Sequence, residues 1–195
     1  MVRGVIGERD TSTDDTLRAQ FRAGRCHHVL LAGFIADASP LRAQVDAAGW
    51  TTFDEPDRGH YDFNRTLVVD DVFAGLCATA EAIVGRRLRV ERAVWLRFRH
   101  RDYQLTKDDA RERPLVARHV ELLYDFSTAM HANCEMVYTD GRESWIVPQI
   151  PSVIALVERE AWLYRYARYF AHTVGDAAVY RLRLTLVDVD TAEGQ

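Results

Sequence analysis

The sequence has few cysteines and no long hydrophobic run. Its three cysteines, Cys26, Cys77 and Cys134, are odd in number and lack the close spacing of a zinc site, so they fit reduced thiols better than a disulfide framework. No stretch approaches the roughly 20 apolar residues of a membrane-spanning helix, and the N-terminus has no apolar run typical of a signal peptide. We therefore expect a soluble, cytoplasmic protein with no membrane partner.

The chain also lacks an excess of positive charge. Its 25 lysines and arginines are outnumbered by 29 aspartates and glutamates, which gives no reason to expect a nucleic-acid partner. About half of the 195 residues are apolar, enough to bury a core without disulfides or metal. We expect a flexible N-terminus over residues 1–12 and one domain over residues 13–190. The sequence leaves a homodimer open.

The first half of the chain has helical periodicity in three places. Residues 11–24 begin with capping residues and end at a glycine, as do residues 39–49, where Pro40 follows Ser39. Residues 71–84 place apolar side chains on one side of a helix that stops at Gly85. The apolar run of residues 28–34 predicts a strand between the first two helices.

After Gly85 the pattern changes to the alternation of half-buried strands, beginning with residues 88–99. Further short strands are predicted at residues 119–126, 134–138, 144–147, 152–157, 164–172 and 178–187. They are separated by turn signals and lack intervening helices, so a parallel nucleotide-binding sheet is disfavoured. The order predicts an α+β protein in which N-terminal helices support one face of an antiparallel sandwich or jelly roll.

Three polar segments lie among these strands: Tyr103-Gln-Leu-Thr-Lys107-Asp108-Asp109, Arg168-Tyr-Phe-Ala-His172, and Tyr180-Arg181-Leu-Arg183. Their order, within roughly residues 90–188, resembles that of the Fe(II)/2-oxoglutarate-dependent oxygenases, whose fold is a double-stranded β-helix, a cupin-like jelly roll. Members hold iron with a His-x-Asp pair and a distant His, and bind 2-oxoglutarate with an Arg. The resemblance implies Fe(II) and 2-oxoglutarate as cofactors.

By this resemblance Asp109 and His172 are two of the three metal ligands, and Lys107 stands where the first imidazole belongs. An alkylammonium has no lone pair for a metal, and its deprotonation near neutral pH costs several kcal/mol. Lys107 then either neutralises Asp109 in a buried salt bridge that replaces the metal, or is a solvated loop residue. The lysine therefore puts iron binding in doubt.

Two further sets of residues bear on the cofactors. His119 and Glu121 form another closely spaced pair that, with His172, is an alternative metal triad. Arg181 and Arg183 share one face of the last strand, where they can hold the carboxylate of 2-oxoglutarate if that face is the barrel interior. Otherwise they are charged residues of an exposed edge strand.

The substrate side offers only candidates. Aromatic and basic residues on the strands line a substrate pocket if they face the barrel interior, and are core residues otherwise. These are Trp95, Arg97, Tyr103, Tyr124 and Tyr138.

Three functions remain open. The first is an oxygenase with an altered metal site that oxidises a small molecule or an amino-acid side chain. The second is a catalytically inactive pseudo-oxygenase that acts as a binding module. The third is a metal-independent enzyme that uses a desolvated Lys107 as base or Schiff-base nucleophile.

Overall fold

The computed structural model describes residues 11–24, 26–35, 37–112, 118–131, 134–170 and 177–189, with only the backbone of residues 11–15 and 112. Most of the predicted flexible N-terminus lies outside these residues. The helices are α1 (Thr11–Arg22), α2 (Ser39–Ala48), α3 (Asp70–Val84) and α4 (Thr106–Glu112). The strands are β1 (His28–Ala32), β2 (Thr51–Glu55), β3 (Gly59–Asn64), β4 (Leu88–Phe98), β5 (Tyr103–Gln104), β6 (Arg118–Asp125), β7 (Met136–Thr139), β8 (Ser144–Val147), β9 (Val153–Glu160), β10 (Tyr164–Ala167) and β11 (Val179–Asp188).

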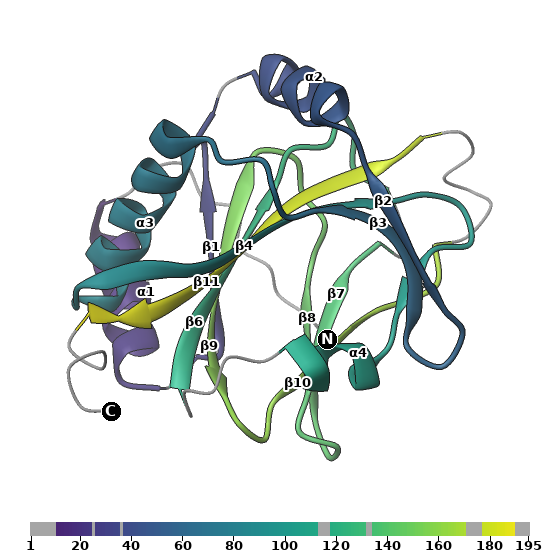
Figure 1. The fold of residues 1–195 in the computed structure, drawn as a ribbon. Helices are drawn as coiled ribbons and strands as arrows, with labels where there is room; N and C mark the ends of the chain where they lie inside the picture. Colours follow the sequence, from purple (N-terminus) through teal and green to yellow (C-terminus); the bar gives the residue numbers. More distant parts are fainter. Residues whose placement is uncertain are drawn as a thin grey trace.

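The strands form an antiparallel sheet that curls into a nearly closed barrel (Figure 1). Its strand order is β1-β9-β6-β11-β4-β3-β5-β10-β7-β8, and β2 pairs with β3 at its side. Strands that follow one another along the chain are mostly not neighbours in the sheet, which is the crossed connectivity of a jelly roll. The predicted α+β jelly roll is confirmed.

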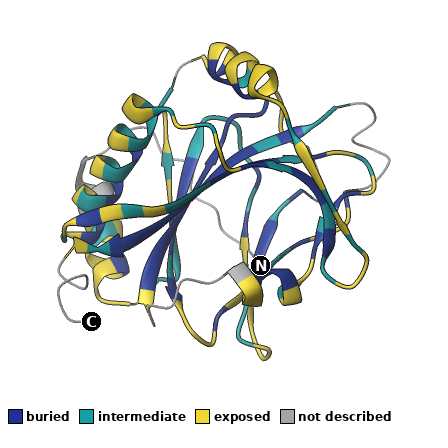
Figure 2. Ribbon diagram, in the orientation of Figure 1, coloured by how far each residue is buried: buried dark blue, intermediate teal, exposed yellow. Residues whose placement is uncertain are grey.

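Alternation along the long central strands creates two apolar cores. On β11, Leu182, Leu184 and Leu186 face the layer of α1 and α3, which covers one face of the sheet. The opposite face of the same strands lines the barrel interior, where Leu96 of β4 and Leu123 of β6 belong to the second core. Figure 2 shows these central strands largely buried, whereas the helices expose their outward faces.

The N-terminal helices follow their local signals except at the start of α2, where Ala38 and not Ser39 is the N-cap. Proline lies in the first turn of α2, and α3 ends where Gly85 adopts the left-handed conformation with φ 76°. No helix among the described residues is long and apolar enough to cross a membrane.

Three features were missed by the sequence prediction: the β2–β3 hairpin, the two-residue strand β5 and α4. The hairpin needs Gly59, because a Cβ there would lie 2.9 Å from the carbonyl oxygen of Tyr103 on the adjoining β5. The hairpin thereby brings Arg58 and Tyr61 close to α4.

Candidate functional site

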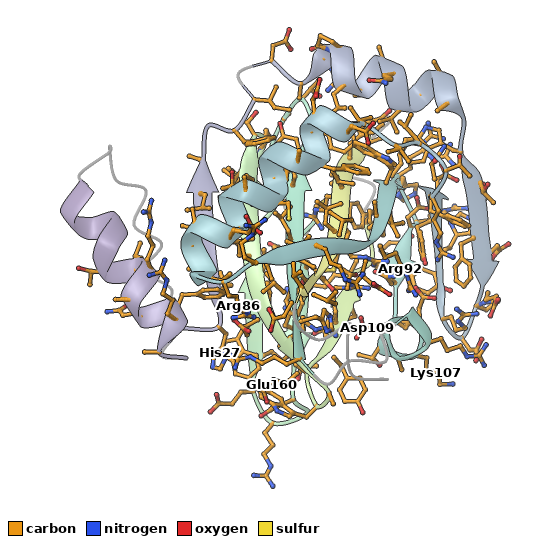
Figure 3. All side chains as sticks on the ribbon, turned by 60° about the vertical axis from the view of Figure 1, so that its left-hand side comes forward. His27, Arg86, Arg92, Lys107, Asp109 and Glu160 are labelled. Carbon is orange, nitrogen blue, oxygen red and sulfur yellow. The ribbon has the colours of Figure 1, made fainter. Side chains whose placement is uncertain are left out.

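The segment that contains Lys107 and Asp109 is a helix, α4. Because each helical residue advances by about 100°, these two side chains point in roughly opposite directions. Asp109 points toward the middle of the molecule and is 2% exposed, whereas Lys107 lies at the periphery with its side chain 70% exposed (Figure 3). Lys107 contacts Asp57, at 3.5 Å, so the predicted pairing of Lys107 with Asp109 is wrong.

Asp109 is instead bound by two arginines from neighbouring strands. Arg159, near the end of β9, donates from Nη2 to Oδ2 at 2.8 Å and from Nη1 to Oδ1 at 3.3 Å. Arg165 of β10 donates its backbone N–H to Oδ2 at 3.0 Å, and its Nη2 lies 3.2 Å from Oδ1. Both guanidiniums are at most 2% exposed. The neighbouring strand thus brings a guanidinium to Asp109 where a metal site requires an imidazole.

The same two arginines hold a second carboxylate, that of Glu121 on β6. Arg159 Nη1 donates to Oε2 at 3.1 Å, Arg165 Nη1 donates to the same oxygen, and the hydroxyl of Tyr138 donates to Oε1 at 2.5 Å. We call Asp109, Glu121, Arg159 and Arg165 the buried quartet. Positive and negative groups alternate in it, so each charge has two opposite neighbours.

The electrostatics keep both carboxyl groups of the quartet ionised. Burial alone would raise the pKa of Asp109 and of Glu121, but Arg165 and Arg159 hold both pKa values below their usual range. The charge of Arg183 further lowers the pKa of Glu121. An ionised quartet is held by attraction among its own members.

His119 lies beside the quartet but has little tendency to carry charge. The residue is 6% exposed and shares the interior face of β6 with Glu121. Burial lowers the pKa of His119 to about 4, so the imidazole is neutral at pH 7. A neutral imidazole is a competent ligand, yet the arginines Arg159 and Arg165 stand close enough to affect its pKa.

Arg181 and Arg183 both lie in the barrel interior, 2% and 3% exposed. Their strand, β11, runs between β4 and β6, so the alternative of an exposed edge strand is wrong. Arg181 lies 3.5 Å from Asp125 Oδ2 and donates to the carbonyl oxygen of Cys134. Their predicted contact with a cosubstrate stays a prediction.

The expected metal triad does not assemble in the described part of the chain. There, no three His, Cys, Asp or Glu side chains are grouped so that they could hold a metal ion. His172, the predicted distal ligand, lies outside the described residues.

Sequence reasoning missed Arg159 and Arg165, although a signal was present. On β9, Ala155, Val157 and Arg159 occupy alternate positions and so share the interior face. A charged residue at an inward position of an apolar strand needs a buried partner, and the pattern could have shown that one was required.

Of the five candidate substrate residues, Tyr138 contacts the buried quartet. Trp95 and Tyr124 belong to the core beneath the helices. Arg97 binds Asp62, and Tyr103 donates to the carbonyl of Pro56. A pocket built from all five residues is therefore not formed.

Comparison with known proteins places this geometry on a familiar fold. No family model and no curated protein sequence matches the chain. Among solved structures, a 2OG-Fe(II) oxygenase family protein from Burkholderia pseudomallei is 14% identical with a TM-score of 0.67, covering 95% of this chain and 93% of its own. A prolyl hydroxylase from Trichoplax adhaerens is 9% identical with a TM-score of 0.65, covering 96% and 98%. The α-ketoglutarate-dependent epimerase SnoN of nogalamycin biosynthesis is 15% identical with a TM-score of 0.63, covering 92% and 84%.

The chain has the fold of the 2-oxoglutarate/iron(II) oxygenases. Oxygenases with this fold hold Fe(II), so the described residues were compared with the ligands that Fe(II) needs. They do not match, because the carboxylate of Asp109 is already bound by Arg159 and Arg165, whose positive charges repel a divalent cation. The donor set needed for Fe(II), two imidazoles and a carboxylate with an open face, is not present among the described residues.

Proposed function

We propose that this protein is a metal-free pseudo-oxygenase, which binds a small molecule or a side chain of a partner without oxidising it. The observation that supports the proposal is the bidentate contact of Arg159 with Asp109, reinforced by Arg165. Two buried guanidiniums supply the positive charge that a metal would otherwise bring to this carboxylate. A binding role needs the barrel but no iron.

The test is to purify the protein after growth with added iron, and to measure its metal content and the formation of succinate from 2-oxoglutarate. We expect no stoichiometric iron and no turnover. An oxygenase with the same fold, loaded by the same protocol, is the control. One iron per chain together with 2-oxoglutarate turnover would overturn the proposal.

A second candidate function is an active oxygenase, in which an imidazole such as His172 contributes to a rearranged site. It is favoured by structures on the same fold that hold metal and cosubstrate: SnoN with Fe³⁺ and α-ketoglutarate, and HygX from Streptomyces hygroscopicus with nickel and 2-oxoglutarate. Arg181 and Arg183 are buried on the interior face of β11, where the resemblance predicts a contact with 2-oxoglutarate. The same measurement of iron and turnover separates the two functions.

The third function, catalysis by Lys107, loses its physical basis. That role was based on a desolvated ammonium group, and the side chain of Lys107 is 70% exposed. The expectation of a desolvated lysine is wrong.

A further inference from the structure

Both oxygens of the Glu121 carboxylate are hydrogen-bonded by side chains of the barrel interior. The residue is 2% exposed, and both of its oxygens accept hydrogen bonds from side chains on other strands. Tyr138 of β7 donates to Oε1, while Arg159 of β9 and Arg165 of β10 donate to Oε2. These three donors converge from three strands on one point inside the barrel.

Such a set of donors is selective for a small carboxylate. Guanidinium groups bind carboxylates through short, charge-assisted hydrogen bonds, and a phenol adds a directed donor. The two guanidinium groups are held in place independently of Glu121, because Arg159 and Arg165 are also bound to Asp109 and because Arg159 donates to the carbonyl of Leu163. The positions of the two arginines therefore do not depend on the side chain of Glu121. We call Tyr138, Arg159 and Arg165 the carboxylate receptor.

We infer that the barrel interior is a carboxylate-binding site whose ligand is the chain's own Glu121, supplied by β6. This inference rests on the proposed function and deepens it. Because the side chain of Glu121 occupies the carboxylate receptor, no free dicarboxylate is bound at that place in the barrel. It also names the ligand class that the site accepts once Glu121 is shortened: small monocarboxylates. The fragment that Glu121→Ala removes is equivalent to acetate, and the fragment that Glu121→Gly removes is equivalent to propionate.

The experiment measures thermal unfolding of Glu121→Ala in a chelator, with acetate added in steps and sodium chloride as the salt control. We expect the variant to unfold at a lower temperature than the wild type, because Arg159, Arg165 and Tyr138 lose an acceptor. Acetate should raise the unfolding temperature saturably, since a ligand that binds only the folded state stabilises it by mass action. Propionate should restore Glu121→Gly better than it restores Glu121→Ala.

The matched control is Glu158→Ala. Glu158 also bridges two arginines, Arg86 at 2.6 Å and Arg118 at 2.7 Å, but lies on the face of β9 opposite to Arg159, and the side chains of both arginines are partly exposed. Its loss should not be restored by acetate beyond the effect of chloride, because water already solvates those arginines. The wild type should likewise respond to acetate and chloride equally.

Acetate that acts no better than chloride on Glu121→Ala would overturn the inference. The same holds if the variant is unfolded at room temperature and acetate does not refold it, as judged by circular dichroism. The chelator makes the rescue experiment independent of iron. If acetate fails to rescue Glu121→Ala while the wild type is metal-free, this inference is wrong and the proposed function stands. If acetate rescues Glu121→Ala but the wild type holds stoichiometric iron, the carboxylate site stands and the proposed function is wrong.

Discussion

At the scale of single residues, the chemistry of the barrel depends on what Asp109 binds. A buried carboxylate is costly unless opposite charges and hydrogen bonds compensate it, and here two arginines provide both. Removing one member of such a set leaves the others buried and uncompensated. Substitutions of Asp109 and of Lys107, two residues apart, should therefore differ widely in effect.

Asp109→Asn should lower the free energy of unfolding by about 3–5 kcal/mol, because Arg159 and Arg165 lose a charged partner in a buried site. Urea denaturation at pH 7 measures the loss. Asp57→Asn is the control, since its side chain is 68% exposed and its pairing with Lys107 should be worth at most about 1 kcal/mol. A loss below about 1 kcal/mol for Asp109→Asn would mean that the quartet contributes little.

Lys107→His should leave stability within about 0.5 kcal/mol of the wild type, because the side chain is exposed. It should also fail to create Fe(II) binding, since the new imidazole would point away from Asp109, which keeps its two arginines. Isothermal titration with Fe(II) under anaerobic conditions checks this. Tight iron binding by the variant would show that the rest of an oxygenase site is present after all.

At the scale of elements, α4 decides which side chains enter the barrel, and Asp108 fastens it. Asp108 is fully buried and accepts hydrogen bonds from Arg58 at 2.8 Å, from Tyr61 at 2.7 Å and from Gln104 at 2.5 Å. These contacts tie α4 to β3 and β5. A seven-residue helix is too short to be stable without tertiary contacts of this kind.

Asp108→Ala should therefore cost about 3 kcal/mol, because two buried donors, Tyr61 and Gln104, and the partly buried Arg58 lose their acceptor. Hydrogen exchange should show faster exchange in α4 than in β6 and β11, which keep their ladder bonds. Ala110→Gln, at an exposed position of the same helix, is the control and should change neither stability nor exchange appreciably. Uniform loss of protection across the sheet would contradict a local role for Asp108.

At the scale of the whole molecule, the buried charges should make the fold sensitive to acid. The folded pKa of His119, about 4, lies below its usual value of 6.5, so between these pH values the unfolded state binds more protons. Its contribution to stability is complete above pH 6.5 and falls away toward pH 4. The lowered pKa values of Asp109 and Glu121 also make the folded state less stable in acid. This loss begins at the usual carboxyl pKa of about 4 and grows below it.

Stability of the wild type should thus fall by about 3 kcal/mol from His119 alone between pH 6.5 and pH 4. Urea denaturation at several pH values measures the slope. His119→Gln, which cannot take up a proton, should flatten the curve in that range and leave the steeper loss below about pH 4 caused by the carboxylates. An unchanged slope in the variant would show that His119 titrates normally in the folded protein.

The elements followed the sequence wherever local signals were strong. Gly85 ends α3, and the alternation of residues 88–99 and 178–187 matches β4 and β11. The β2–β3 hairpin and α4 were missed because long-range contacts stabilise them, such as Arg58 with Asp108. A seven-residue helix leaves little local pattern to detect, whereas the turn of the hairpin, Pro56-Asp-Arg-Gly59, carried a signal that was overlooked.

Three predicted site residues, Asp109, Arg181 and Arg183, are buried in the structure, but the sequence did not reveal their partners. Their roles toward a metal and a cosubstrate stay predictions. The direction of Lys107 depends on whether residues 106–112 are helical or extended, since a period of about 3.6 instead of 2 reverses it relative to Asp109. That choice is made by the contacts of Asp108.

The sequence by itself determined the fold class, because the alternation of apolar residues specifies which face of each strand is buried. It left open whether Arg181 and Arg183 face the barrel interior or an exposed edge. Only the tertiary structure decided the partners of Asp109 and Glu121, since Arg159 and Arg165 lie at least 38 residues away from either carboxylate in the chain. The energy of a buried charge depends on its neighbours in space, and the order of residues along the chain does not contain that information directly.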